Sequence, residues 1–210
     1  MDRRETAQLC HTVARTCTRF PRSAGAGASA VGVALAVFAP SAAAQPKPGC
    51  EHATTPVSAA SRPELQRAVV CLINQQRTRR GLPRLLINSR LNRSAQSWTD
   101  AMVHRRDFSH GADFASRISS AGFEWSNVGE NIATGYRTPA SVMRGWMASA
   151  GHCQNILSPS FLNVGIGVSE HPIRGVSRSA GTWTQDFALP RGKRAPSSNV
   201  GPASGCPYRA

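Results

Sequence analysis

The spacing of apolar residues predicts two long amphipathic helices in the first half of the sequence. The first runs from Pro63, which suits an opening helical turn, to about Arg80, and Gly81-Leu82-Pro83 ends it. The second follows Asn88, a favourable N-cap. Apolar residues recur every three or four positions in both, so each helix has one face to bury. These residues are Leu65, Ala68, Val69, Leu72 and Ile73 in the first helix, and Leu91, Ala95, Trp98 and Met102 in the second.

Shorter elements are predicted further along the chain. The expected helices cover residues 114–121, 139–147 and 150–157, and the expected strands cover residues 85–87, 128–133, 163–168 and 182–187. Residues 190–210 are rich in Pro, Gly, Ser and Arg and should form an irregular tail. Because helices come first and strands and helices then mix, the sequence predicts a small α+β layered domain.

Residues 1–44 have the pattern of a secretory signal peptide. A basic segment with five Arg precedes the apolar run 28–38, and the small residues 41–44 offer a cleavage site near Ala44. The apolar run is too short to span a bilayer comfortably, although an uncleaved N-terminal anchor is the alternative. We therefore expect a secreted, extracellular protein that starts at Gln45 and has no membrane span after cleavage.

Export changes the interpretation of the cysteines. The mature chain keeps Cys50, Cys71, Cys153 and Cys206, and an even number in an oxidising compartment favours two disulfides. Four cysteines allow three pairings, and the sequence alone does not choose among them. We prefer Cys50–Cys71, which would tether a Pro- and Ser-rich leader at residues 45–62, together with Cys153–Cys206, which would anchor the tail.

The chain is strongly basic, with a formal net charge of +14, of which residues 1–44 carry +3. Such a charge favours anionic partners such as envelope polymers, lipid headgroups or nucleic acid. The basic residues are scattered, however, and no dense basic run carries interleaved aromatic residues. The sequence therefore has no specific nucleic-acid motif, and a solvated Arg-rich surface is the simpler interpretation.

Three side chains stand out as candidates for chemistry. His110, Glu130 and His152 each lie beside small or turn-forming residues, at intervals of 20 and 22 residues, so no single helix can bring them together. If the tertiary fold does so, two imidazoles and a carboxylate could ligate a metal or perform acid–base chemistry. Alternatively, Glu130 could serve as an internal hydrogen-bonding centre that fixes the loop of His110.

Several short phrases occur in an order that resembles one known family. They are Phe108-Ser109-His110, Gly129-Glu130-Asn131-Ile132-Ala133, Gly151-His152, Asn155-Ile156-Leu157 and Trp183-Thr184-Gln185-Asp186-Phe187. Together they resemble the bacterial secreted branch of the CAP (SCP/PR-1-like) superfamily, which comprises cysteine-rich secretory proteins, antigen 5 and pathogenesis-related 1 proteins. The resemblance covers about Val69 to Ala188 and makes residues 63–189 one CAP domain. It implies a three-layer α-β-α sandwich with a central antiparallel sheet.

The resemblance also implies a surface cavity lined by His and Glu, where some members hold a divalent metal such as zinc. The candidate metal ligands are His110, Glu130 and His152, and the candidate cavity-wall residues are Asn131 and Gln185. In one departure, Thr182 stands where animal and plant members have a strand His, and no second cavity Glu is matched. The four-residue set of those members is therefore incomplete, and His152 would supply the second imidazole.

The sequence leaves three functional classes open. The leading hypothesis is a monomeric extracellular binding module with a His/Glu cavity that holds a divalent metal and a groove for lipids or anionic envelope polymers. The rival is a metal-assisted hydrolase, acting as a peptidase or nuclease. A structural or host-interacting secreted module needs no chemistry in the cavity at all. Whether the protein is an enzyme is therefore left open by its sequence.

Overall fold

The computed structural model describes residues 49–196 and residue 206, so the expected signal peptide lies outside the described part. The helices are α1 (Arg62–Thr78), α2 (Ser89–Arg105), α3 (Phe114–Ser120), α4 (Pro139–Met147) and α5 (Ala150–Leu157). The strands are β1 (Leu86–Ile87), β2 (Trp125–Thr134), β3 (Asn163–Ser169) and β4 (Thr182–Pro190). The predicted helices and strands are therefore all present, with ends shifted by a few residues.

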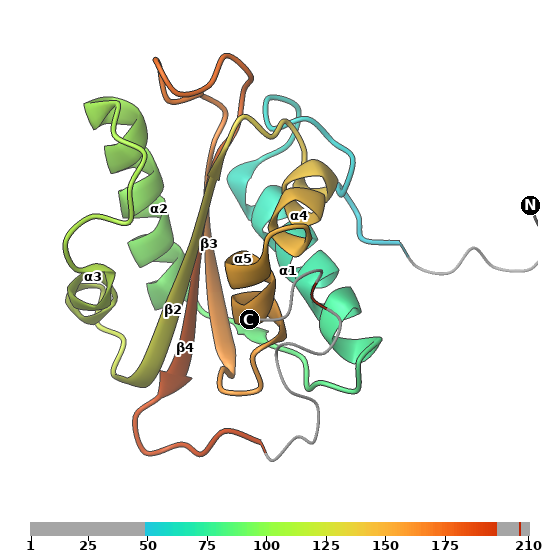
Figure 1. Ribbon diagram of the computed structural model, residues 1–210, viewed down its shortest axis with the longest axis vertical. Helices are drawn as coiled ribbons and strands as arrows, with labels where there is room; N and C mark the ends of the chain where they lie inside the picture. Colours follow the sequence, from blue (N-terminus) through green and yellow to red (C-terminus); the bar gives the residue numbers. More distant parts are fainter. Residues whose placement is uncertain (1–48, 197–205, 207–210) are drawn as a thin grey trace, which may run out of the picture. The chain divides into compact units, whose positions relative to one another are not determined.

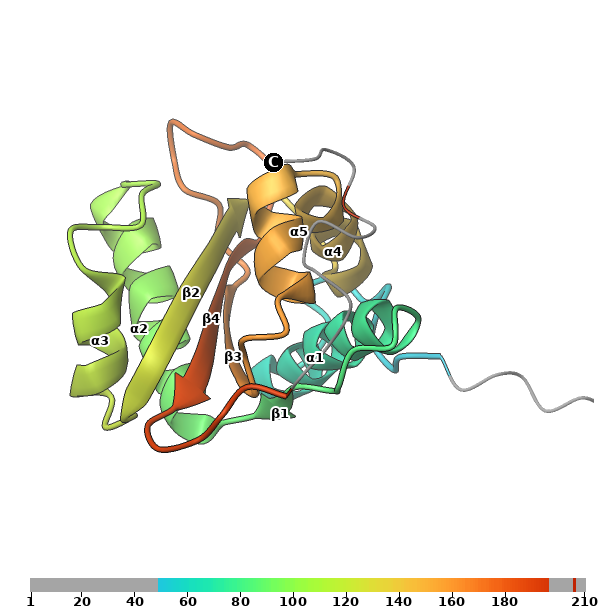
Figure 2. The same cartoon turned by 60° about the horizontal axis from the view of Figure 1, so that its bottom comes forward.

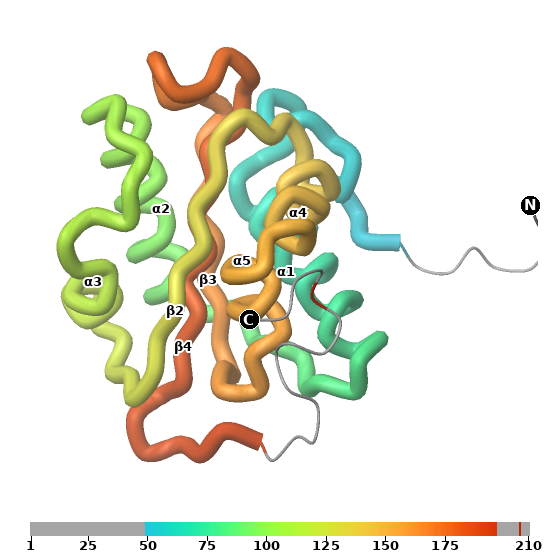
Figure 3. Tube along the Cα trace, in the orientation of Figure 1, coloured from blue at the N-terminus to red at the C-terminus, as the bar shows by residue number. Residues whose placement is uncertain are grey.

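The domain has three layers, as predicted. Helices α2 and α3 cover one face of the sheet, and α1, α4 and α5 cover the other (Figures 1 and 2). The tube in Figure 3 shows the same order of layers along the chain trace. Burial of one apolar face by each helix explains the arrangement, because an amphipathic helix and a sheet each need an apolar partner surface.

The strands lie in the order β1-β3-β4-β2, which places β2 at one edge of the sheet. Strand β4 pairs antiparallel with both β2 and β3, and Glu130 lies opposite Asp186 in this register. The expectation of an antiparallel sheet holds for these three long strands. The two-residue strand β1 instead runs parallel to β3, which is possible because a long stretch of chain that includes α2 connects them.

Helix α2 lies unusually close to β3. A Cβ atom at Gly165 would lie 2.1 Å from the carbonyl carbon of Leu91, so only glycine permits this approach. The side chain of Asn88 accepts hydrogen bonds from the backbone N–H groups of Arg90 (2.9 Å) and Leu91 (3.4 Å), as an N-cap should. Helix α2 therefore starts at the predicted cap and is held against the sheet that carries the site.

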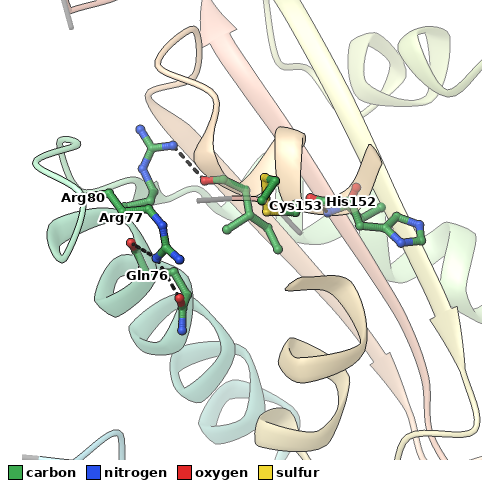
Figure 4. Close-up of a disulfide and its surroundings, with 8 residues drawn as sticks. Gln76, Arg77, Arg80, His152 and Cys153 are labelled. Carbon is green, nitrogen blue, oxygen red and sulfur yellow. Dashed lines mark hydrogen bonds between the residues drawn. A yellow bond between two sulfur atoms is a disulfide. The ribbon is translucent and has the colours of Figure 1, made fainter. Parts of the chain in front are cut away.

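Two disulfides join the segments that lie outside the layers to helices of one face. Cys50–Cys71 ties the N-terminal segment to α1, and Cys153–Cys206 ties the C-terminal segment to α5. This is the pairing preferred from the sequence. Figure 4 shows the second disulfide, with the neighbouring side chain of His152 pointing away from it.

Arg77 fixes the end of α5 from within the core. Its side chain is fully buried and donates hydrogen bonds to the carbonyl oxygens of Pro83 (2.7 Å), Ile156 (2.9 Å) and Ser158 (2.7 Å). Burial lowers the pKa of Arg77 to about 10. A periodicity argument places such a residue on a helix but does not reveal that it caps another helix.

No helix in the described part of the chain is long and apolar enough to cross a bilayer.

Candidate functional site

The loop that carries His110 is fixed by side chains from both flanking helices. The indole Nε1–H of Trp98 in α2 donates to the carbonyl of Ser109 (3.0 Å), and Arg117 in α3 donates to the carbonyl of His110 (2.9 Å). Gly111 has a φ of +68°, and a Cβ there would lie 2.7 Å from the Trp98 ring. The close packing of this loop therefore depends on glycine at 111, and it sets the position of the His110 ring.

Glu130 lies at the centre of the site and is almost fully buried. Its side chain is 1% exposed, against 50% for that of His110. One carboxylate oxygen lies 2.7 Å from Nδ1 of His110, and the other accepts a hydrogen bond from Nη2 of Arg117. A buried carboxylate is costly unless it is paired and hydrogen-bonded, and both of its oxygens have partners here. Glu130 thus takes the role of the hydrogen-bonding centre considered above.

Arg117 is a site residue that the sequence analysis missed. Besides pairing with Glu130, its guanidinium lies over the ring of Trp98, 4.0 Å from the ring centroid. Among 25 Lys and Arg residues, nothing in the sequence marked this one as the partner of Glu130. Only the placement of α3 against β2 brings it to the carboxylate.

Asp186 is a second buried carboxyl group, directly across the sheet from Glu130. Burial raises the pKa of Asp186 well above its ordinary value, and the charge of Glu130 adds to the shift. The protonated form of Asp186 is therefore favoured, while Glu130 has the cationic partner Arg117. The signal available in the sequence was an acidic residue within the predicted strand 182–187.

Glu130 and Asn131 are neighbours in the edge strand, and so their side chains face opposite layers. Glu130 contacts Arg117 of α3, whereas Asn131 donates to the backbone carbonyl of His152 in α5 (3.1 Å). The consecutive residues Glu130 and Asn131 of β2 therefore contact the two helical layers on opposite faces of the sheet.

The two candidate wall residues, Asn131 and Gln185, lie buried in the sheet and are hydrogen-bonded to each other. Both are fully buried, and Asn131 donates a hydrogen bond to the amide oxygen of Gln185 (2.9 Å). Asn155 of α5 completes the network by donating to the side-chain oxygen of Asn131 (2.8 Å) and to the carbonyl of Glu130 (3.1 Å). This network fixes α5 and its His152 relative to β2.

His152 lies in the first turn of α5 and is partly buried. Burial lowers the pKa of His152 below its ordinary value, and the nearby charge of His110 contributes less. The position in the first helical turn acts in the same direction, because the positive end of the helix disfavours the imidazolium. The neutral form is therefore favoured, but the main cause is desolvation.

A pocket of about 280 Å³ opens beside His152. Its lining includes the apolar or aromatic side chains of Phe108, Ile132, Tyr136 and Trp146, together with His152. Phe108 is 39% exposed, so this wall of the pocket is open to solvent. The pocket therefore combines largely apolar walls with the His152 ring and a few hydroxyl groups.

The predicted set of three metal ligands does not fit a metal ion in this arrangement. Among the described residues, no group of three His, Cys, Asp or Glu side chains is placed to hold one. The reason lies in Glu130, because one oxygen is occupied by His110 and the other by Arg117. Metal binding stays a prediction. It would require Glu130 either to orient His110 by hydrogen bonding to its Nδ1 atom or to exchange one of its present partners for the metal.

Comparison with known proteins gives a consistent result. The model of the cysteine-rich secretory protein family, CAP, matches residues 70–187. The uncharacterized protein YkwD of Bacillus subtilis is 35% identical over 139 residues, which cover 64% of this chain and 51% of that protein. The chain thus matches about half the length of this relative.

Two solved structures share the fold. An extracellular protein containing an SCP domain from Bacillus anthracis has a TM-score of 0.53 and 23% identity, covering 61% of this chain and 44% of its own. An outer surface protein from Borrelia burgdorferi has a TM-score of 0.52 and 17% identity, covering 59% of this chain and 90% of its own. At these identities the likeness extends to the fold alone.

Proposed function

Because the chain belongs to the cysteine-rich secretory protein (CAP) family, we propose that it is an exported binding module whose pocket beside His152 takes the apolar part of an amphipathic ligand. Two observations support export. Residues 1–44 have the composition of a signal peptide, and two solved structures of the same fold are described as extracellular or outer-surface proteins.

The pocket itself carries the proposal. Its volume of about 280 Å³ lies just below the range of roughly 300–1,000 Å³ that is typical of small-molecule sites. Largely apolar walls with a few polar groups, among them His152, fit an alkyl chain or ring that ends in a hydrogen-bonding head. Neutral His152 can donate to or accept from that head, whereas an imidazolium could only donate.

A lipid is the ligand class that these features favour. The net charge of +11 that remains after residues 1–44 are removed (14 − 3) attracts anionic headgroups toward the surface, and the pocket would then receive part of the apolar tail. The predicted binding of anionic envelope polymers uses the same charge but does not need the apolar pocket.

Retention of radiolabelled palmitate by the purified mature chain tests this proposal. Ser149 lines the pocket and makes no side-chain cap bond to α5, so Ser149→Phe should fill the pocket without removing a helix cap. We expect saturable binding by the wild type and its loss in Ser149→Phe. Ala148→Phe, one residue away and exposed, is the matched control and should bind normally. Absence of saturable binding to palmitate or sterol would refute the proposal.

Metal binding is the second candidate. Nδ1 of the half-exposed His110 ring lies 2.7 Å from the buried Glu130 carboxylate, a pairing that would orient the other ring nitrogen toward a ligand. We propose that His110 and His152 would hold a divalent ion such as zinc, with Glu130 orienting His110 through Nδ1. Such an ion would supply Lewis acidity to the hydrolase considered from the sequence.

Metal analysis of protein purified without an affinity tag separates binding from catalysis. A metal site predicts about one zinc per chain in the wild type and loss of metal in both His110→Ala and His152→Ala. A hydrolase additionally requires peptidase or nuclease turnover that falls in both variants. Sub-stoichiometric metal together with unchanged turnover would eliminate this mechanism.

A further inference from the structure

One end of the sheet carries two exposed apolar side chains within a basic surface. Leu86 is 67% exposed and Ile87 is 45% exposed, and together they form the whole of strand β1. Successive side chains of a strand point to opposite faces of the sheet, so the exposure of both means that neither helical layer covers β1. The pair therefore differs from the single exposed apolar residues that are normal on protein surfaces.

Segments from distant parts of the sequence meet at this end of the sheet. Strand β1 pairs with the first two residues of β3, and the register places the end of β4 and the start of β2 at the same end (Figure 2). The backbone N–H of Arg191, just after β4, donates to the carbonyl of Glu124, just before β2 (3.0 Å). The side chain of Arg93, near the start of α2, donates to the carbonyl of Ala121 (3.1 Å). The start of α2 therefore belongs to this end as well.

The exposed charged side chains around Leu86 and Ile87 are nearly all cationic. Within the described segments 84–93, 121–126, 158–163 and 188–194, Glu124 is the one acidic residue. Among the described residues, no carboxylate forms a salt bridge with any of the six cations of these segments. We define the β1 face by its exposed side chains, which are Arg84, Leu86, Ile87, Arg90, Arg93, Arg191, Lys193 and Arg194.

The positive charge of the β1 face is not offset from within the sheet. Glu130 and Asp186 are both buried there. Glu130 is paired with Arg117, and the protonated form of Asp186 is favoured. The sequence has the same asymmetry, because residues 65–99 contain seven Arg and no Asp or Glu. The β1 face is therefore a positive surface with an apolar pair inside it.

We propose that the β1 face docks on the surface of a membrane that contains anionic lipids. Arg84 and Arg90 contact lipid phosphates, while Leu86 and Ile87 enter the boundary between headgroups and acyl chains. A membrane surface offers anionic groups and an apolar layer side by side. A soluble anionic polymer would leave the two apolar side chains in water, and a second copy of this chain would bring two positive faces together.

The β1 face is separate from the pocket beside His152. That pocket is lined by Ile132, Ala133 and Thr134 at the end of β2, whereas the β1 face lies at the end of the sheet where β2 begins. Membrane docking therefore goes beyond ligand binding in the pocket, and each can fail without the other.

Co-sedimentation of the mature chain with vesicles of equal parts phosphatidylglycerol and phosphatidylcholine tests the proposal. We expect saturable binding that weakens as salt is added and is lost with phosphatidylcholine alone. Leu86→Ser combined with Ile87→Ser should weaken binding about tenfold, because it removes the inserted apolar groups. Arg84→Gln combined with Arg90→Gln should weaken it about 25-fold, because each arginine near an anionic surface contributes roughly fivefold.

Exposed residues at the opposite end of the sheet provide matched controls. Val176 is 52% exposed, and Arg174 and Arg178 are exposed in the same connection between β3 and β4. Val176→Ser, and Arg174→Gln combined with Arg178→Gln, should change the affinity for vesicles by less than about twofold. Melting temperatures of all these variants should match the wild type, since each change affects exposed side chains only.

Several results would overturn the proposal. Unchanged vesicle binding after Leu86→Ser combined with Ile87→Ser would mean that the face recognises charge alone, as expected for a soluble anionic polymer. Absence of saturable binding, or equal losses in the control variants, would show that the β1 face does not dock on a membrane. Sedimentation velocity would reveal a dimer, and a dimer that the Leu86 and Ile87 changes dissociate would assign the face to a second copy of the chain.

Discussion

At the scale of single residues, the buried charge of Glu130 depends on Arg117. The guanidinium is held by the Glu130 carboxylate, the carbonyl of His110 and the face of Trp98, so it cannot move without breaking all three contacts. The candidate ligands His110 and Glu130 were identified from sequence, because each lies in a recognisable phrase. Arg117 and Asp186 were not, because their roles arise only from helix placement and strand register.

Replacement of Arg117 should therefore destabilise the domain. Arg117→Leu leaves the buried carboxylate of Glu130 without its arginine partner, and we expect the free energy of unfolding to fall by about 3 kcal/mol. Urea denaturation measures this change. Arg90→Leu, on the exposed surface, serves as the control. The double variant with Glu130→Gln should recover part of the loss, and a strictly additive double variant would show that the two side chains are not coupled.

The raised pKa of Asp186 should make the free energy of unfolding depend on pH with a sign opposite to that expected for a salt-bridged acid. Because the pKa of Asp186 is raised above its ordinary value of 3.8, the folded state binds more protons than the unfolded state above about pH 4. Its contribution to stability is present at low pH and is lost as pH rises toward the raised pKa. Asp186→Asn should thus gain stability relative to wild type as pH rises from 5 to 8, and parallel urea midpoints would contradict this assignment.

At the scale of elements, α5 is the helix that determines the geometry of the pocket. It is joined to β2 by the Asn131–Asn155 network, to the C-terminal segment by Cys153–Cys206 and to α1 by Arg77. Periodicity and capping residues predicted all the long elements, since those signals are local. The parallel pairing of β1 and the attachment of α5 depend on distant segments, and so the sequence pattern did not contain them.

Arg77→Leu should loosen α5 more than it disturbs the other helices. The change removes three hydrogen bonds to backbone carbonyls, two of them at the end of α5, and should cost about 2–3 kcal/mol. Amide hydrogen exchange would show faster exchange in α5, measured beside the exposed control Arg79→Leu. Unchanged protection of α5 in Arg77→Leu would mean that its attachment is provided by the disulfide and the amide network alone.

At the scale of the whole molecule, the described domain presents two cavities on either side of the edge strand. The pocket beside His152 is lined mainly by β2, α4 and α5 and includes Phe108, and a second cavity lies between α2 and α3. Arg117, Glu130 and His110 lie between them. The CAP fold therefore provides the framework, and we expect ligand recognition to depend on side chains that lie where the helical layers contact β2.

Intermolecular NOEs between a bound fatty acid and the mature chain would show whether the ligand lies in the pocket beside His152. We expect contacts from the alkyl chain to the rings of Phe108, Tyr136 and Trp146, with the carboxyl end near His152. These contacts should disappear in Ser149→Phe and persist in Ala148→Phe. NOEs confined to other surfaces, or none under conditions where the wild-type chain is folded and the fatty acid is monomeric, would contradict this placement of the ligand.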